Sequence, residues 1–107
     1  MNTLQEQFVT EARELIRQAT DDLIALELPS NPTTGYRWAF AYIDESLIVV
    51  ESADYRAANA AVGSGGVERW MLRARLPGTT RIELKRLRPW EGDRSIVERF
   101  NVKLNIK

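Results

Sequence analysis

A strict alternation of apolar and polar residues in the second half of the chain constrains its fold most strongly. Every other residue is apolar from Phe100 to Ile106, and residues 69–76 alternate in the same way. The apolar positions of the second segment are Trp70, Leu72, Ala74 and Leu76. A period of two is that of an extended strand with one face toward a core and the other toward solvent. The alternation therefore predicts β-strands that are buried on one face.

Shorter segments of the same kind predict further strands. They are residues 23–28, 36–42 (with Tyr36, Trp38, Phe40 and Tyr42 on one face), 47–50 and 80–85 (with Ile82 and Leu84 inward). Proline and glycine separate several of them, as in Pro77-Gly78. Short strands between turn signals indicate an antiparallel β-sandwich. A chain of 107 residues is one domain, so we predict a single all-β domain over residues 1–107.

The beginning of the chain follows a different period. Its apolar residues recur at spacings of three and four, and good helix formers stand between them. These apolar residues are Leu4, Phe8, Ala12, Leu15, Ile16 and Ala19. Taken locally, the pattern predicts an amphipathic helix over residues 4–19.

Two missing residue types exclude most enzyme mechanisms. The chain has no cysteine and no histidine, so it has no disulfide, no thiol nucleophile and no Ser-His-Asp site. We expect neither a metal nor a cofactor.

Fifteen basic and fifteen acidic residues cancel, which argues against nucleic acid and anionic lipid as partners. No apolar run is long enough to span a bilayer, and the first residues lack the features of a signal peptide. Met1 could also begin a mature, exported protein, so both cytoplasmic and secreted or periplasmic locations stay open.

Three connections between the predicted strands are unlike ordinary turns. The first, residues 29–36, contains Pro32, which holds Asn31 extended, and Gly35, which permits a positive φ. Such a loop is nearly rigid before it meets a partner. The second, residues 58–67, has three glycines in four positions, which leave bare backbone for close approach. The third, residues 87–92, carries Trp90 after a proline and an arginine, the composition of an interface anchor.

Each loop read alone has a structural explanation that is at least as good. A well-made turn accounts for residues 29–36, a flexible connection accounts for the glycines, and a tryptophan folded over the sandwich edge accounts for Trp90.

Together, and in this order, the three loops resemble the chagasin family of cysteine-protease inhibitors. That family has Asn-Pro-Thr-Thr-Gly-aromatic, Gly-x-Gly-Gly and Arg-Pro-Trp in its three inhibitory loops. The matching residues, which the resemblance assigns to protease binding, are Asn31, Pro32, Thr33, Thr34, Gly35, Tyr36, Gly63, Ser64, Gly65, Gly66, Arg88, Pro89 and Trp90. The resemblance covers about residues 22–107, and residues 1–20 match poorly.

The resemblance implies an immunoglobulin-like antiparallel β-sandwich with three inhibitory loops at one end. It implies a monomeric, reversible, tight-binding competitive inhibitor of papain-like cysteine proteases (papain and cathepsin-type enzymes). The loop of residues 31–36 would cover the catalytic cysteine, the glycine loop would follow the unprimed side of the cleft, and Trp90 would lie on the primed side. The motif also favours a strand somewhere in residues 13–20, against the local helical pattern.

Other classes of function remain as alternatives. An immunoglobulin-like binding or adhesion module would need an aromatic platform on a sheet face, whereas Tyr36, Trp38 and Phe40 fit a core. Nucleic-acid binding would need a shared basic face, for which the candidates are Arg69, Arg73, Arg81 and Lys85. An enzyme would have to rely on adjacent acids such as Asp21 and Asp22 or Asp44 and Glu45, which in turns usually serve solvation and capping.

Overall fold

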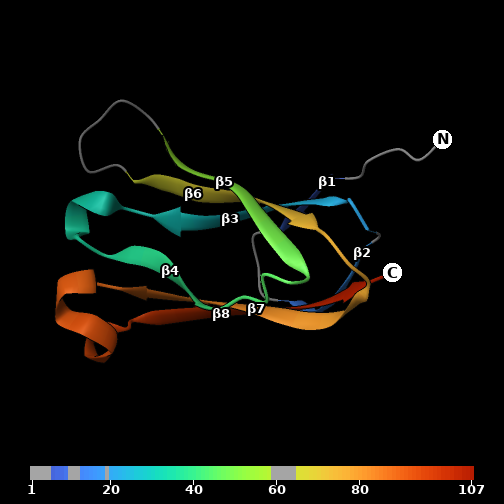
Figure 1. Cartoon of the computed structure of the whole chain (residues 1–107). Coiled ribbons are helices and arrows are strands. Elements are labelled where there is room, and N and C mark those ends of the chain that lie inside the picture. The colour runs from blue at the N-terminus through green and yellow to red at the C-terminus, as the bar shows by residue number, and fades with distance from the viewer. Residues whose placement is uncertain (1–5, 10–12, 19, 59–64) are drawn as a thin grey trace.

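The computed structural model is a sandwich of two four-stranded β-sheets (Figure 1). It describes the backbone of residues 6–9 and 13–18, and residues 20–58 and 65–107 with their side chains. The strands are β1 (Glu6–Val9), β2 (Arg13–Gln18), β3 (Leu23–Ser30), β4 (Arg37–Tyr42), β5 (Ile48–Ala57), β6 (Gly66–Ala74), β7 (Gly78–Leu87) and β8 (Glu98–Ile106). One sheet, here sheet A, has the order β1-β3-β6-β5, and the other, sheet B, has the order β2-β8-β7-β4. The predicted all-β sandwich is confirmed.

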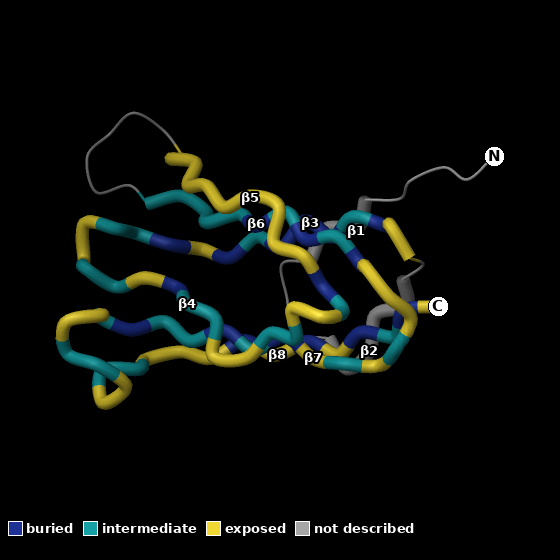
Figure 2. The backbone as a smooth tube through the Cα atoms, in the orientation of Figure 1, coloured by how far each residue is buried: buried dark blue, intermediate teal, exposed yellow. Residues whose placement is uncertain are grey.

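The core lies between the two sheets and is built by the alternating residues (Figure 2). Buried side chains of sheet A and sheet B face one another across it; they include Ile24, Leu26, Leu72, Ile82, Leu84, Val102 and Leu104. The rings of Phe40 and Trp70 meet edge to face, with 6.0 Å between their centroids. The face was predicted wrongly for two residues. Tyr42 does not share the face of Trp38 and Phe40, because a register shift between Phe40 and Tyr42 brings it opposite Glu83 and beside Arg81 on the outer face. Leu76 is 49% exposed, because β6 ends at Ala74 and the chain has already turned toward β7.

The amphipathic helix predicted for residues 4–19 is wrong, and the strand expected within residues 13–20 is confirmed. The backbone forms β1 and β2 instead, which pair parallel with β3 and β8. Residues 4, 5, 10–12 and 19 lie outside the described part of the chain. Pairing with a sheet edge satisfies the backbone groups on one side of each strand, and this tertiary gain exceeds a weak local helix preference. All other strand pairings are antiparallel.

One end of the sandwich gathers the connections that the sequence marked as unusual. β3 leads into β4, β5 into β6 and β7 into β8 at this end, which we call the loop pole. It comprises residues 30–36, residues 58 and 65 beside the ends of β5 and β6, and residues 88–97. Its two short 3₁₀ helices, η1 (Pro32–Thr34) and η2 (Pro89–Ser95), lie side by side at the left of Figure 1. The C-terminus lies at the opposite end.

No helix in the described residues is both long and apolar enough to cross a membrane.

Candidate functional site at the loop pole

The first loop is a 3₁₀ turn that its own side chains hold closed. Asn31 caps η1 with its carboxamide oxygen, which accepts hydrogen bonds from the Thr33 backbone N–H (3.2 Å) and the Thr33 hydroxyl (2.6 Å). The Thr34 hydroxyl donates to the Asn31 carbonyl (2.8 Å) and accepts from the Tyr36 N–H (3.3 Å). Pro32 stands in the first turn, where its missing N–H costs nothing. These hydrogen bonds hold Asn31, Thr33, Thr34 and Tyr36 in one arrangement, in keeping with the rigid loop that the sequence predicts.

Two hydrogen bonds between the sheets tie this loop to the sandwich. The Trp38 indole N–H donates to the carbonyl of Pro29 across the core (2.9 Å), so the two ends of the first loop are joined. The Trp38 backbone N–H donates to a carboxylate oxygen of Glu68 on β6 (3.2 Å). The alternation in the sequence predicts that Trp38 is a core residue. It does not predict the hydrogen bonds of Trp38 with Pro29 and Glu68, because alternation along one strand says nothing about which residues of the other sheet lie opposite.

The described part of the second loop requires glycine for steric reasons. Gly65 has a φ of 77°, and its carbonyl accepts a hydrogen bond from the Ala58 N–H (2.9 Å). A Cβ on Gly66 would overlap the Arg56 carbonyl oxygen of β5. The other two residues predicted for this loop, Gly63 and Ser64, lie outside the described residues.

The third loop is η2, which is closed by Ser95 and anchored by an ion pair. The Ser95 hydroxyl donates to the Gly92 carbonyl (2.7 Å) and accepts from the Arg88 N–H (3.0 Å). Lys85 on β7 contacts the Asp93 carboxylate (2.7 Å), and this hydrogen bond holds the pKa of Asp93 below its ordinary value. Neither Ser95 nor Asp93 was predicted as a site residue. The run of Gly, Asp and Ser in residues 92–95 was the available signal for a structured turn.

Trp90 lies against the first loop and presents most of its ring to solvent. It is 72% exposed, the largest exposure among the described large hydrophobic residues. A Cβ built on Gly35 would lie inside van der Waals distance of the ring, 3.2 Å from Cζ2. Gly35 also has a φ of 82°, which a side chain would disfavour. The first and third loops are therefore in direct contact through this glycine and this ring.

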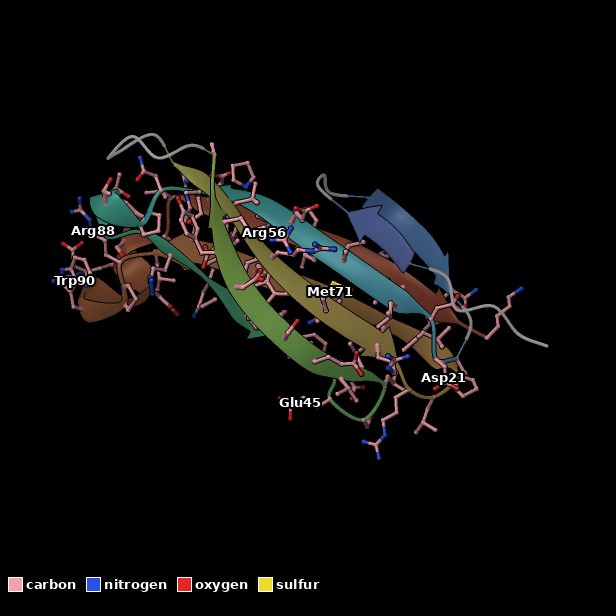
Figure 3. All side chains as sticks on the ribbon, turned by 90° about the horizontal axis from the view of Figure 1, so that it is seen from above. Asp21, Glu45, Arg56, Met71, Arg88 and Trp90 are labelled. Carbon is pink, nitrogen blue, oxygen red and sulfur yellow. The ribbon has the colours of Figure 1, made fainter. Side chains whose placement is uncertain are left out.

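Arg88 joins the same two loops by a second contact. Its guanidinium stacks on the Tyr36 ring, 4.5 Å from the centroid, and Nη1 lies 3.5 Å from the Glu91 carboxylate. Its Nε is buried without a hydrogen-bond partner among the described residues. Figure 3 shows Arg88 and Trp90 at the same end of the molecule. The structure thus brings together Arg88, Pro89 and Trp90 with residues 31–36.

The acids considered for an enzyme lie away from the loop pole. Asp21 lies toward the far end from Arg88 and Trp90 in Figure 3, and Glu45 lies near the middle of the molecule, apart from both. Asp44 caps its own turn, since its carboxylate accepts from the Ser46 N–H and hydroxyl (3.0 and 2.5 Å). The described residues contain no group of acids that could hold a metal ion. These acids are therefore turn residues outside the loop pole.

The residues considered for other partners do not form a common surface. Trp38 is buried and Phe40 packs against the core, so neither can serve as an exposed aromatic platform. Arg69 and Arg73 lie on β6 of sheet A, whereas Arg81 and Lys85 lie on β7 of sheet B. The four basic residues proposed for nucleic acid therefore occupy opposite sides of the sandwich.

Comparisons with known proteins agree with this geometry. The model of the chagasin family peptidase inhibitor I42 matches residues 18–104. Chagasin of Trypanosoma cruzi is 35% identical over 91 residues, which cover 80% of this chain and 83% of that protein. The crystal structure of the cysteine protease inhibitor EhICP2 from Entamoeba histolytica is similar over 100% of both chains, with a TM-score of 0.88 and 24% identity. The structure of PbICP-C in complex with falcipain-2 matches 100% of this chain and 96% of that chain, with a TM-score of 0.64 and 13% identity.

Proposed function

Because the chain belongs to the chagasin family of cysteine-protease inhibitors, we propose that it inhibits papain-like cysteine proteases by covering their active-site cleft with the three loops of the loop pole. Membership of an inhibitor family also agrees with the prediction that the chain is not an enzyme. The observation that carries the proposal is the contact of Trp90 with Gly35, which makes one continuous surface of two loops whose tips are 55 positions apart in sequence.

The first loop is preorganised to fill a cleft. Its hydrogen bonds around Asn31 exist before any partner binds, so little conformational entropy is left to lose. The carbonyls of Asn31 and Pro32 already accept the N–H groups of Thr34 and Gly35 (3.1 and 3.0 Å). A turn closed in this way does not offer an extended peptide to the catalytic cysteine. Inhibition is therefore reversible and leaves the loop uncut.

The third loop supplies the large apolar contact. The edge of the Trp90 ring lies against Gly35, and most of the side chain is exposed to a partner without any rearrangement of the loop. Aromatic residues held in this way dominate the affinity of many interfaces. Arg88 then acts mainly within the inhibitor, because its guanidinium is stacked on Tyr36.

The second loop contributes backbone rather than side chains. Gly65 and Gly66 stand at the loop pole beside Ser30 and Asn31, which places bare backbone next to the first loop. A protease cleft can bind such backbone by hydrogen bonds of the strand-addition kind. The assignment of Gly63 and Ser64 to the same contact stays a prediction.

Titration against proteases tests the proposal. The chain should inhibit papain and a cathepsin competitively, leave trypsin active, and release active protease on dilution with its own mass unchanged. Falcipain-2 is a further enzyme to assay, since PbICP-C is seen in complex with it. Stoichiometric cleavage of the chain, or full papain activity at micromolar inhibitor, would contradict the proposal.

A further inference from the structure

The outer faces of the two sheets differ in how their charges are arranged. On sheet A, Arg69 stands between Glu27 and Asp54 in the strand register, and Arg73 forms a two-contact ion pair with Glu51 (2.7 and 3.1 Å). Each of these cations is thus next to an anion. The arrangement is the ordinary one, because opposite charges across strands are stabilising.

On sheet B, cations stand opposite cations. Lys85 of β7 is in register with Arg99 of β8, and Arg81 is in register with Lys103. All four alternate with the inward residues Ile82, Leu84, Phe100 and Val102, so they project from the outer face. Like charges directly opposite one another destabilise a sheet. The arrangement therefore does not serve the fold.

The basic residues form a strip along the strands rather than a scattered set. Along a strand the two cation pairs are four residues apart, which is about 13 Å. Arg37 extends the strip toward the loop pole, since it pairs with Leu87 at the end of β7. Glu83 and Asp93 offset two of the five cations, through Arg81 and Lys85. Among the described side chains, none forms an ion pair or a hydrogen bond with Arg37, Arg99 or Lys103.

We propose that this strip, formed by Arg37, Arg81, Lys85, Arg99 and Lys103, binds a linear sulfated polysaccharide and leaves the loop pole free. Guanidinium and ammonium groups at two levels along one line match anionic groups that repeat along a chain. Between those levels Glu83, which pairs with Arg81, stands opposite Asn101, whose exposed and uncharged amide suits the hydroxyl groups of a sugar.

The surface fits other polyanions less well. Single-stranded nucleic acid needs several exposed rings for base stacking, and this face offers one among the described residues, Tyr42, on which the Arg81 guanidinium already stacks at 4.1 Å. Duplex DNA is read by an element that enters a groove, which a flat sheet face does not provide. A lipid surface is planar, whereas four of these five cations form a line two strands wide.

Heparin is the probe, and two variants of equal net charge separate the strip from overall charge. Arg99→Gln with Lys103→Gln removes two cations from the strip, and Arg56→Gln with Arg75→Gln removes two exposed cations elsewhere. At low ionic strength, the full chain should bind heparin and not fully desulfated heparin. The first variant should bind about tenfold or more weakly, and the second should bind like the wild type. The second should keep the wild-type melting temperature, the first should melt at the same temperature or higher because two like-charge pairs are removed, and the first should inhibit papain as the wild type does.

Several results would overturn the proposal. They are absence of heparin binding at low ionic strength, equal losses in the two variants, and tighter binding to single-stranded DNA or to vesicles of anionic phospholipid than to heparin. If the strip variant fails to fold, Lys103→Gln alone replaces it, with Arg75→Gln as its control, and an unchanged affinity would then contradict the proposal. Papain inhibition is measured separately, so failure here is distinct from failure of the inhibitor function.

Discussion

Gly35 and Trp90 show how single residues shape the loop pole. The ring occupies the space that a side chain at Gly35 would need, and the positive φ of Gly35 turns the first loop toward the ring. Because most of the Trp90 side chain is exposed, its removal should affect affinity more than stability, whereas a side chain at Gly35 also opposes the left-handed backbone there.

Replacement of Trp90 by alanine should weaken papain inhibition by about 2–4 kcal/mol, mainly through faster dissociation. The melting temperature should barely change, because the side chain is 72% exposed. Leu76→Ala is the matched control, since Leu76 is an exposed apolar residue outside the loop pole and should alter neither quantity. Dissociation rates and thermal unfolding measure both. Wild-type affinity in Trp90→Ala would remove Trp90 from the interface.

Gly35→Ala should lower affinity through the position of Trp90. The added Cβ overlaps the ring, and the left-handed backbone costs roughly 1–2 kcal/mol for a residue with a side chain. The affinity loss should therefore be smaller when Trp90 is already alanine. Inhibition constants of the two single variants and the double variant give this coupling. Strict additivity would mean that the contact between the loops does not matter for binding.

Among the elements, η2 depends on an ion pair with its neighbouring strand. The pKa of Asp93 is lowered by Lys85, so the carboxylate is ionised in the folded protein at lower pH than in the unfolded chain. The stabilisation is fully present above the ordinary pKa of aspartate and is lost as the pH falls through the lower folded value. The melting temperatures of the wild type and Asp93→Asn should differ at neutral pH and converge in strong acid.

Glu51→Gln is the matched control for that prediction. Glu51 has a pKa that its hydrogen bond with Arg73 lowers in the same way, but it lies on β5 outside the loop pole. Both variants should show the same kind of acid convergence, whereas only Asp93→Asn should weaken papain inhibition at neutral pH. Equal inhibition by the two variants would show that the ion pair of η2 does not position the third loop.

For the whole molecule, the features that could be predicted from the sequence are those that depend on residues close together in the chain. The alternation from Phe100 to Ile106 identified β8 and its inward face, and the turn residues of 31–36 identified a rigid loop. The prediction from the sequence failed at residues 4–19. There the local period favours a helix, but pairing with β3 and β8 makes the chain form strands. The sequence also could not show the contacts of Trp90 with Gly35 and Arg88 with Tyr36, because only the sandwich brings these distant residues together.

The parallel pairing of β2 with β8 bears on how the molecule reaches its folded state. This pairing joins Arg13 with Val102 and Gln18 with Ile106, so it closes nearly the whole chain into one ring. Closing so large a ring is entropically unfavourable until other contacts compensate, and chains dominated by such distant contacts fold in milliseconds to seconds. During synthesis, β2 must wait for β8 to leave the ribosome before sheet B can be completed. The third loop precedes β8 directly, so it acquires its final support only at that late step.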